Sequence, residues 1–246
     1  MPNESLTIAA FKELIQSDEQ QTTSLSAYKS ATDSHLETSL IELLCESDKV
    51  TNLTIDFASK HGILTKNDLR FLRAFISKIK FMEKWPVLYH LITNMYDIEL
   101  LKTMHTDDKQ TSLLLHLLFS PIFDERWFKV ILHFMDQNKF DLKYKGTNGL
   151  TLLDGAIHQN NIFLIQYFIC KGLKFTDSTG ATGRDFVQSC IYLSKDSLLK
   201  RYQTIEACIK YGYDITTKDK NGLTLRDYIE KYIPKKHNGK YIELLR

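Results

Sequence analysis

The chain is poor in residues that interrupt regular structure. Its 246 residues include 4 prolines and 10 glycines, and no stretch is rich in glycine and serine. Because flexible linkers are built from such stretches, their absence argues against domains joined by a long tether. The hydrophobic content of 43% is sufficient for a continuous core.

Cysteine is also scarce, with Cys45, Cys170, Cys190 and Cys208 scattered along the chain without metal-binding spacing. The last three lie in apolar segments of helical periodicity. We therefore predict reduced thiols inside a core, rather than disulfides, and a reducing compartment.

Long apolar runs are missing as well. The most apolar stretch, residues 113–123, contains His116, Ser120 and Pro121, and it is too short to span a bilayer. The first residues lack the basic start and apolar core of a signal peptide. The sequence predicts a soluble, cytoplasmic protein without a transmembrane segment, or one exported by a route that leaves no N-terminal signal.

The chain has no strong excess of one charge, because its net charge is +2. The charge is uneven: residues 1–48 carry −7 and the other 198 residues carry +9. The acidic segment could dock on the basic remainder or contact a partner, or both could be ordinary solvated surfaces. Nucleic-acid binding requires a more basic domain, so we expect no nucleic-acid partner. The cluster at residues 235–240 is interpreted as a solvated end, with a basic edge for other anionic partners as the alternative.

Motifs that indicate chemistry are absent from the sequence. It contains no phosphate-binding loop, nucleotide-binding glycine pattern, zinc spacing or nucleophile elbow. A catalytic cysteine needs a neighbouring base and a third, orienting group, and the sequence indicates neither beside Cys190 or Cys208. We expect a non-enzyme without cofactor or metal.

What the chain does contain is a repeat. Residues 149–156 read GLTLLDGA, residues 180–187 read GATGRDFV and residues 222–229 read GLTLRDYI. Each block has a turn glycine, a threonine two residues later and an aspartate in the sixth place. Self-similarity at intervals of about 20–50 residues is typical of stacked repeat proteins.

Each of the first two blocks begins a pair of helices. A polar turn at residues 158–161 is followed by an apolar segment, 162–169, and then by Gly172. The second pair ends with residues 204–210 and Gly212. Glycine commonly ends a helix because it adopts the left-handed conformation. The second pair is nine residues longer, and we place this insertion as a loop at residues 192–202.

These blocks resemble the ankyrin repeat, a turn followed by two helices with a period of about 33 residues. Thr151, Leu153 and Ala156 match its motif, while all three blocks lack the family's proline. Weaker copies occupy residues 84–145, where residues 125–135 should form a helix with Trp127, Val130, Ile131 and Phe134 on one face. The faintest copy occupies residues 50–83.

The resemblance implies an all-α fold, an ankyrin-type helix–turn–helix repeat solenoid. Five to six degenerate repeats would occupy residues 50–246, clearest over 146–233, and residues 1–49 would form a helical N-terminal cap or extension. The aspartates Asp154, Asp185 and Asp227 should accept hydrogen bonds from a neighbouring turn. His90 should have a structural role, because the motif histidine of the family forms hydrogen bonds that join neighbouring turns.

The resemblance also implies a function: a monomer that binds a protein partner in the concave groove of the stack, without catalysis. Leu150 and Leu223 are either exposed contacts or folded against the next repeat. The predicted partner-binding residues lie at turn tips, at the end of a first helix and in the insertion: Thr147, Asn148, Leu150, His158, Gln159, Tyr192, Tyr202, Lys220, Asn221 and Leu223.

Two further possibilities remain open from the sequence. In the first, the N-terminal region carries an enzymatic or toxin-like activity and the repeats bind its substrate. The second concerns origin. The degenerate repeats are similar to ankyrin effectors that intracellular bacteria deliver to the host cytosol by type IV secretion, although a eukaryotic or viral adaptor would share these features.

Overall fold

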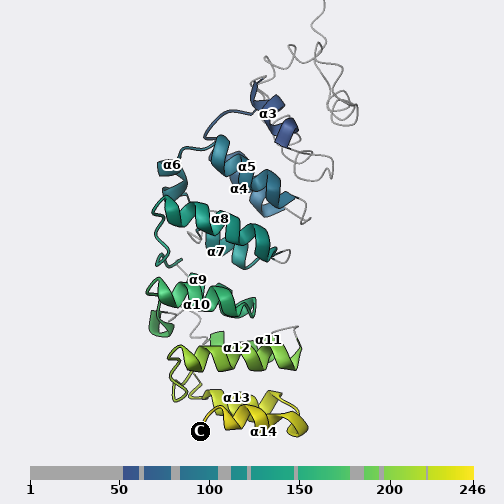
Figure 1. The fold of residues 1–246 in the computed structure, drawn as a ribbon, viewed down its shortest axis with the longest axis vertical. Coiled ribbons are helices and arrows are strands. Elements are labelled where there is room, and N and C mark those ends of the chain that lie inside the picture. Colours follow the sequence, from purple (N-terminus) through teal and green to yellow (C-terminus); the bar gives the residue numbers. More distant parts are fainter. Residues whose placement is uncertain are drawn as a thin grey trace, which may run out of the picture. The chain divides into compact units, whose positions relative to one another are not determined.

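The computed structural model describes nine stretches of the chain: residues 52–60, 64–78, 84–104, 112–120, 123–146, 149–177, 186–193, 197–219 and 221–246. Every regular element within them is a helix (Figure 1). The predicted all-α class is thus confirmed for this part of the chain. The predicted cap at residues 1–49 lies outside the described residues, as do Thr147, Asn148, Asp185 and Lys220.

The chain divides into two compact units. Unit 1 comprises residues 1–104 and 121–138, and unit 2 comprises residues 105–120 and 139–246. Along the sequence, the chain therefore passes from unit 1 to unit 2 after residue 104, back to unit 1 at residue 121 and again to unit 2 at residue 139.

Unit 1 is organised around one helix, α5 (Trp85–Asn94), which contacts α3 (Asn52–Lys60), α4 (Leu69–Lys78) and α8 (Glu125–Gln137). A short helix, α6 (Ile98–Thr103), follows α5 and is capped by the Asp97 carboxylate. Trp85 is 1% exposed and lies edge-on to Phe123 at 6.4 Å between ring centroids. These contacts bury most of α5, which is expected of a helix with three helical neighbours.

Helix α8 forms where predicted but buries a different face. Val130 is 40% exposed, and Trp127 and Phe134 are half-buried. Both of these rings contact Tyr89 of α5, at 6.0 Å and 6.2 Å between centroids. The buried residues of α8 are Phe128, Ile131, Leu132 and Met135. The predicted face was wrong because apolar residues surround much of this helix, so only its packing partners select the inner side.

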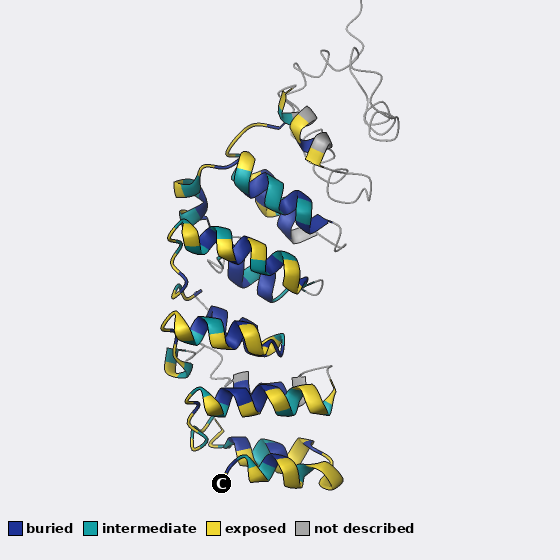
Figure 2. Cartoon of the chain, viewed as in Figure 1, coloured by how far each residue is buried: buried dark blue, intermediate teal, exposed yellow. Residues whose placement is uncertain are grey.

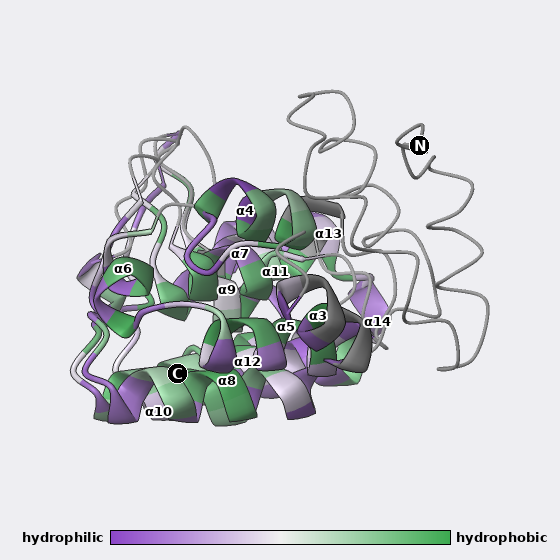
Figure 3. Ribbon diagram, turned by 90° about the horizontal axis from the view of Figure 1, so that it is seen from above, coloured by the Kyte–Doolittle hydropathy of each residue, from purple (hydrophilic) through white to green (hydrophobic). Residues whose placement is uncertain are grey.

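The described residues of unit 2 form the three-residue 3₁₀ helix η3 (Phe175–Asp177) and seven α-helices: α7 (Leu113–Leu118), α9 (Leu152–His158), α10 (Ile162–Cys170), α11 (Phe186–Leu193), α12 (Leu198–Lys210), α13 (Leu225–Tyr232) and α14 (Lys235–Glu243). Helix α7 contacts α9, α9 contacts α11, and α11 contacts α13. Helices α10 and α12 contact each other in a second layer (Figure 3). Helix pairs α9–α10, α11–α12 and α13–α14 are therefore joined side by side.

Helices α10 and α12 of unit 2 end in the same way. The backbone N–H of Gly172 donates to Ile169 O at 2.9 Å, and that of Gly212 donates to Ile209 O at 3.0 Å. Both glycines have positive φ, 88° and 95°. These angles and hydrogen bonds are those of a helix-ending motif that favours glycine, so the predicted glycine stops are confirmed. Asn160, with φ 49°, ends α9 in the same manner.

Gly155 allows two helices of unit 2 to approach closely. A Cβ atom built on Gly155 would lie 2.7 Å from the Cβ atom of Leu118 in α7, closer than real side chains approach. Since Leu118 is itself fully buried, it has no room to move away. The contact between α7 and α9 therefore depends on the missing side chain at this position.

The predicted insertion loop is largely helix. Tyr192 lies in α11 and Tyr202 lies in α12, which has 13 residues where α10 has 9. The loop prediction was wrong because it aligned only the apolar end of the helix. Ser197 caps α12 by accepting a hydrogen bond from Lys200 N, and this signal marks the true start.

The basic cluster at residues 235–240 also belongs to a helix, α14, which begins after Pro234. The lysines Lys235, Lys236 and Lys240 are exposed, as expected of solvated residues. Tyr241 is 2% exposed, and its hydroxyl donates to Leu198 O at 2.5 Å. Burial raises the pKa of Tyr241 to about 12. One aromatic side chain thus anchors α14 to the start of α12.

The cysteine prediction holds for two of three described residues. Cys190 and Cys208 are buried thiols, whereas Cys170 is an exposed thiol. Cys170 is the last residue of α10 and lies four positions after Gln166, which is also exposed. Helical periodicity therefore places it on the outer side of α10, which an almost wholly apolar sequence conceals.

Candidate functional site

Two turns of unit 2 have the same backbone geometry. In the first, Gly146 N donates to Leu150 O at 3.2 Å and Gly149 N donates to Gly146 O at 2.8 Å. In the second, Asp219 N donates to Leu223 O at 2.9 Å, and Gly222 N donates to Asp219 O at 2.9 Å. The φ angles of Gly149 and Gly222 are 71° and 78°. The similar sequences of the two blocks therefore form similar turns.

Both turns lead into a helix through a capping box. Asp154 Oδ2 accepts from Thr151 N at 2.7 Å and from Thr151 Oγ1 at 2.8 Å, while Asp154 N donates to Thr151 Oγ1 at 3.3 Å. Thr224 and Asp227 form the same three hydrogen bonds. The structural role predicted for these aspartates is confirmed. In both turns these hydrogen bonds come from the threonine of the same turn.

The capping box explains why the turns need no proline. Proline favours the first helical turn because its φ is already fixed. Here the side chains of Thr151 and Asp154 hold the same backbone positions by hydrogen bonds. Since the reciprocal bonds satisfy two otherwise unpaired donors, Leu152 and Leu225 are acceptable at the position that follows the threonine.

Asp219 holds the second turn together. Its Oδ1 accepts from the backbone N–H groups of Asn221 and Leu223, at 2.9 Å and 2.8 Å. Its Oδ2 accepts from Tyr228 Oη at 2.8 Å. Burial acts to raise the pKa of Asp219, but these hydrogen bonds outweigh it and lower the pKa. The carboxylate therefore stays ionised as part of the turn.

The predicted tip residues are only partly accessible. Leu150 and Leu223 are half-buried, and Asn221 is exposed. Among the described residues of the two tip segments, 143–150 and 214–223, the exposed charged ones are Lys143, Lys145, Asp214 and Lys218. Each leucine therefore lies between the two predicted alternatives, exposed contact and inward packing, because part of it is buried and part is open to solvent.

The helix-end residues His158 and Gln159 differ in their surroundings. His158 is exposed, and its ring lies 5.0 Å from the ring of Phe119. Partial burial there lowers the pKa of His158, so the imidazole is neutral near pH 7. Gln159 Nε2 donates to Leu118 O at 2.5 Å. Gln159 thus links two helices, whereas His158 presents its edge to solvent.

The tyrosines of the predicted insertion do not form a loop surface. Tyr202 is half-buried and lies edge-on to Tyr241, with 5.4 Å between ring centroids. The side chain of Tyr192 lies outside the described residues. Part of the Tyr202 ring is therefore used for packing α12 against α14.

A buried glutamine in α11 was missed by the sequence analysis. Gln188 is 1% exposed, and its Nε2 donates to Thr217 O at 2.9 Å and to Leu223 O at 3.3 Å. It therefore fastens the second turn to the preceding helix. A lone amide inside the apolar segment FVQSCIYL was the available signal, because buried polar side chains require hydrogen-bond partners.

The described side chains of two first helices, α9 and α11, offer little accessible surface. All of residues 151–157 and 187–191 are buried (Figure 2). The large exposed apolar residues described in unit 2 lie on the second helices α10 and α12, where Ile162 is 38% exposed, Phe163 50% and Leu199 67%, and on the first helix α13, where Tyr232 is 42% exposed. A partner can thus reach the turn segments and helix ends on one side, and α10 and α12 on another.

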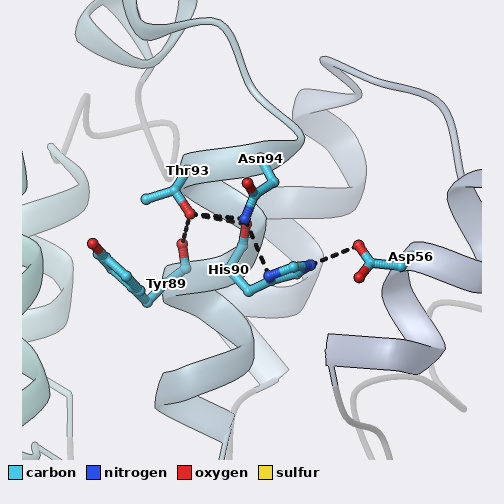
Figure 4. A network of polar contacts seen from close by, with 5 residues as sticks. All are labelled: Asp56, Tyr89, His90, Thr93 and Asn94. Carbon is cyan, nitrogen blue, oxygen red and sulfur yellow. Dashed lines mark hydrogen bonds and ion pairs between the residues drawn. The ribbon is translucent and has the colours of Figure 1, made fainter.

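Unit 1 contains a polar network around His90 (Figure 4). His90 Nε2 lies 2.7 Å from Asp56 Oδ1 of α3, and Nδ1 lies 3.1 Å from Asn94 Nδ2. With Nε2 donating to the carboxylate, Nδ1 accepts from the amide. The structural role predicted for His90 is confirmed, although it joins two helices rather than two turns. Asp56 is largely exposed, so water reaches one side of the network.

The described residues offer few groups for chemistry. No cluster of three or more His, Cys, Asp or Glu side chains suited to a metal ion occurs among them. Within the same part of the chain, no helix combines the length and apolar character needed to cross a membrane. Of the carboxylates that recur in register, the two described ones, Asp154 and Asp227, are engaged in capping boxes, where they organise the backbone.

Searches against protein-family models, curated proteins and solved structures find no match for this chain. The function proposed below is therefore inferred from the geometry of the described residues.

Proposed function

We propose that this chain is a non-catalytic protein-binding module built from ankyrin-type repeats. The observation that supports it most is the repeated turn. Two segments 73 residues apart, beginning at Gly149 and Gly222, share the same turn hydrogen bonds and the same Thr–Asp capping box. Repetition of both sequence and geometry is what stacked repeats require, because each unit must present the same surface to its neighbour.

The packing of unit 2 also supports the proposal. Its first helices contact one another in series, and the second helices α10 and α12 contact each other. In such an arrangement each helix pair buries its apolar side against the next pair, and the turns project from one edge. The projecting turns are the natural place for a partner to bind.

The partner would contact the tip segments around residues 143–150 and 214–223, together with the exposed edge of His158. Lys145 and Lys218 are exposed in these segments, and Asn221 is exposed beside them. Half-buried Leu150 and Leu223 add apolar area next to these polar groups. A stable interface buries at least about 1,000 Å² in total, so contacts from several turns are needed.

The test is capture of partners from cell lysate by the purified full chain, with identification by mass spectrometry. The tip variant carries Lys145→Glu and Lys218→Glu, which change charge at exposed positions of both turns. The matched control carries Lys236→Glu and Lys240→Glu on α14, the same chemical change away from the turns. Circular dichroism verifies that all three proteins are equally helical.

We expect a partner that binds the unmodified chain and the α14 control but is lost from the tip variant. The absence of a specific partner would contradict the proposal. So would a partner that the tip variant retains and the α14 control loses.

A further inference from the structure

The helix pair α13–α14 of unit 2 contains a stretch without acidic residues. Residues 231–242 include no aspartate or glutamate and four lysines: Lys231, Lys235, Lys236 and Lys240. All four lysines are exposed. We call these lysines, together with Tyr232, the basic corner of unit 2. The stretch therefore carries +4, more than the +2 of the whole chain.

The lysines of α14 lie on the outer side of the helix (Figure 2). Tyr241 is the buried residue of α14, and its ring lies against that of Tyr202 in α12. Lys236 and Lys240 are four positions apart, so they share one side of the helix. A Cβ atom built on Gly239, next to Lys240, would meet nothing within 4 Å. The outer side of α14 is thus open and cationic.

The neighbouring carboxylates leave this charge in place. Glu230 of α13 pairs with Arg226, with 3.9 Å between Oε1 and Nη1. Glu243, the last residue of α14, is exposed. No ion pair between described residues involves a lysine of the basic corner. The four ammonium groups are therefore accessible to an anionic partner.

An exposed aromatic side chain accompanies the lysines. Tyr232 is 42% exposed, and Lys231 Nζ lies 5.1 Å from the centroid of its ring. The ring of Tyr228 stacks on that of Tyr232, with 5.9 Å between centroids. Tyrosine is enriched where lipid meets water, because its ring is apolar and its hydroxyl is polar. The basic corner thus combines cationic groups with a side chain suited to that boundary.

We propose that the basic corner of unit 2 binds the surface of an anionic lipid membrane. Clusters of four or more lysines on a helix are attracted to anionic headgroups, and each lysine strengthens binding about fivefold. Lysine suits this role because its charge lies on a flexible stem and needs no fixed geometry. The contact is reversible, because charge alone holds a protein less firmly than an inserted helix.

Two other anionic partners fit the basic corner less well. Protein interfaces are poor in lysine and rich in arginine, whereas all four cations of the basic corner are lysines. Nucleic-acid-binding domains usually have a pI above about 9, and the pI of this chain is about 8.2. A row of lysines along the outside of a helix matches a broad lipid surface better than either partner.

The first experiment measures co-sedimentation of the purified full chain with lipid vesicles. One set of vesicles contains phosphatidylcholine with phosphatidylserine, and the other contains phosphatidylcholine alone. We expect binding to the first set only, and weaker binding at high salt, because salt screens the attraction. Absence of binding to the anionic vesicles would overturn the proposal, as would equal binding to both sets.

Matched charge-reversal variants locate the contact. Lys236→Glu with Lys240→Glu should weaken binding to the anionic vesicles by more than about twentyfold, because two lysines are lost. Lys145→Glu with Lys218→Glu makes the same change of net charge in the tip segments and should weaken it far less. Circular dichroism verifies that both variants remain helical. Equal losses would mean that binding follows net charge alone, which overturns the proposal.

Lysine acetylation gives a second measurement on the unmodified chain. Mass spectrometry of the peptides reports how fast a small acetylating reagent modifies each amine. Anionic vesicles should slow the modification of Lys235, Lys236 and Lys240 several-fold and leave that of Lys145 and Lys218 unchanged. Protection of the tip lysines without protection of α14 would overturn the proposal.

Soluble polyanions identify the source of the negative charge. Polyglutamate and single-stranded RNA are added in place of the vesicles at the same concentration of charge. We expect both to protect the lysines of α14 less than the vesicles do. Stronger protection by polyglutamate would overturn the proposal in favour of an acidic protein, and stronger protection by RNA in favour of a nucleic acid.

These outcomes are separate from those of the partner capture, and the inference does not rest on the proposed function. Pure vesicles contain no protein, so a failure of vesicle binding leaves the partner surface at the turns untouched. Capture from a lysate cleared of membranes does not depend on lipid. The absence of a captured partner therefore leaves the lipid contact untouched.

Discussion

The two turns that begin at Gly149 and Gly222 share their hydrogen bonds but differ in their surroundings. Thr151 and Asp154 are 1% and 0% exposed, whereas Thr224 and Asp227 are half-buried. Helix α9, which follows the first turn, contacts α7, α10 and α11, while α13, which follows the second, contacts α11 and α14. The same local geometry is therefore built twice, and only its packing differs.

The formation of the capping box and its contribution to stability therefore have different physical causes. The capping box forms in both environments because it needs only four neighbouring residues. Its contribution to stability depends on whether water can replace a lost hydrogen bond. We therefore expect identical substitutions to cost more in the first turn than in the second.

We expect the largest difference between the two copies at the residue that follows the capping aspartate. Gly155 in the first copy corresponds to Tyr228 in the second. Gly155→Tyr should destabilise unit 2 by more than about 3 kcal/mol, the upper range for overpacking, because Leu118 occupies the required space. Gly155→Ala should cost less, about 1 kcal/mol or more. Urea unfolding followed by circular dichroism measures both.

The control for this prediction is Gly239→Tyr in α14, where a Cβ atom would meet nothing within 4 Å. It should change the free energy of unfolding by no more than about 0.5 kcal/mol, as is usual for surface substitutions. Equal losses at Gly155 and Gly239 would contradict the close approach between α7 and α9.

The capping aspartates provide the next largest effect. Asp154→Ala removes the oxygen that accepts from both donors of Thr151, and should cost about 1–3 kcal/mol because the site is buried. Asp227→Ala removes the same hydrogen bonds at a more solvated site and should cost clearly less. Urea unfolding of the two variants compares them directly. A larger loss at Asp227 would refute the role assigned to burial.

A smaller loss of stability is expected from a substitution of Gln188, whose side chain anchors the second turn to α11. Gln188→Leu removes the amide that donates to Thr217 O and Leu223 O. The net loss should be about 1 kcal/mol, the usual contribution of a hydrogen bond. Hydrogen exchange should accelerate at residues 217–223 and stay unchanged at residues 144–150. Equal acceleration in both turns would indicate general destabilisation instead.

The smallest effect is a pH dependence from Asp227. Hydrogen bonds from the backbone N–H and hydroxyl of Thr224 lower the pKa of Asp227 in the folded protein. Its contribution to stability is complete above the ordinary aspartate pKa, about 3.9, and disappears as pH falls through the lowered folded value. Carboxyl-carbon NMR titration measures this pKa. A value at or above the ordinary one would contradict the capping geometry.

The helical class and several helix ends were predictable because their causes are local. The glycine stops at Gly172 and Gly212 follow from the left-handed conformation, which glycine adopts easily. The equivalence of the first and third blocks was visible in their Gly–x–Thr–x–x–Asp pattern. The direction of the aspartate hydrogen bonds was not, since a pattern identifies a polar acceptor but not which donor is nearest.

The exposed side of α10 was invisible to the sequence analysis for a similar reason. Helix α10 is almost entirely apolar, so its periodicity does not separate Phe163, which is 50% exposed, from Phe168, which is fully buried. The same limitation led to the wrong inner face of α8. Where most residues are apolar, the neighbouring helices decide which of them are covered.

The helical class, the repeated turns and the glycine stops follow from the amino-acid sequence, because each depends on residues within a few positions of one another. Tertiary packing sets the buried face of α8, the close approach at Gly155, the anchoring of a turn by Gln188 and the exposure of α10. Each of these depends on atoms distant in sequence, and local hydrogen bonding and periodicity carry no information about them.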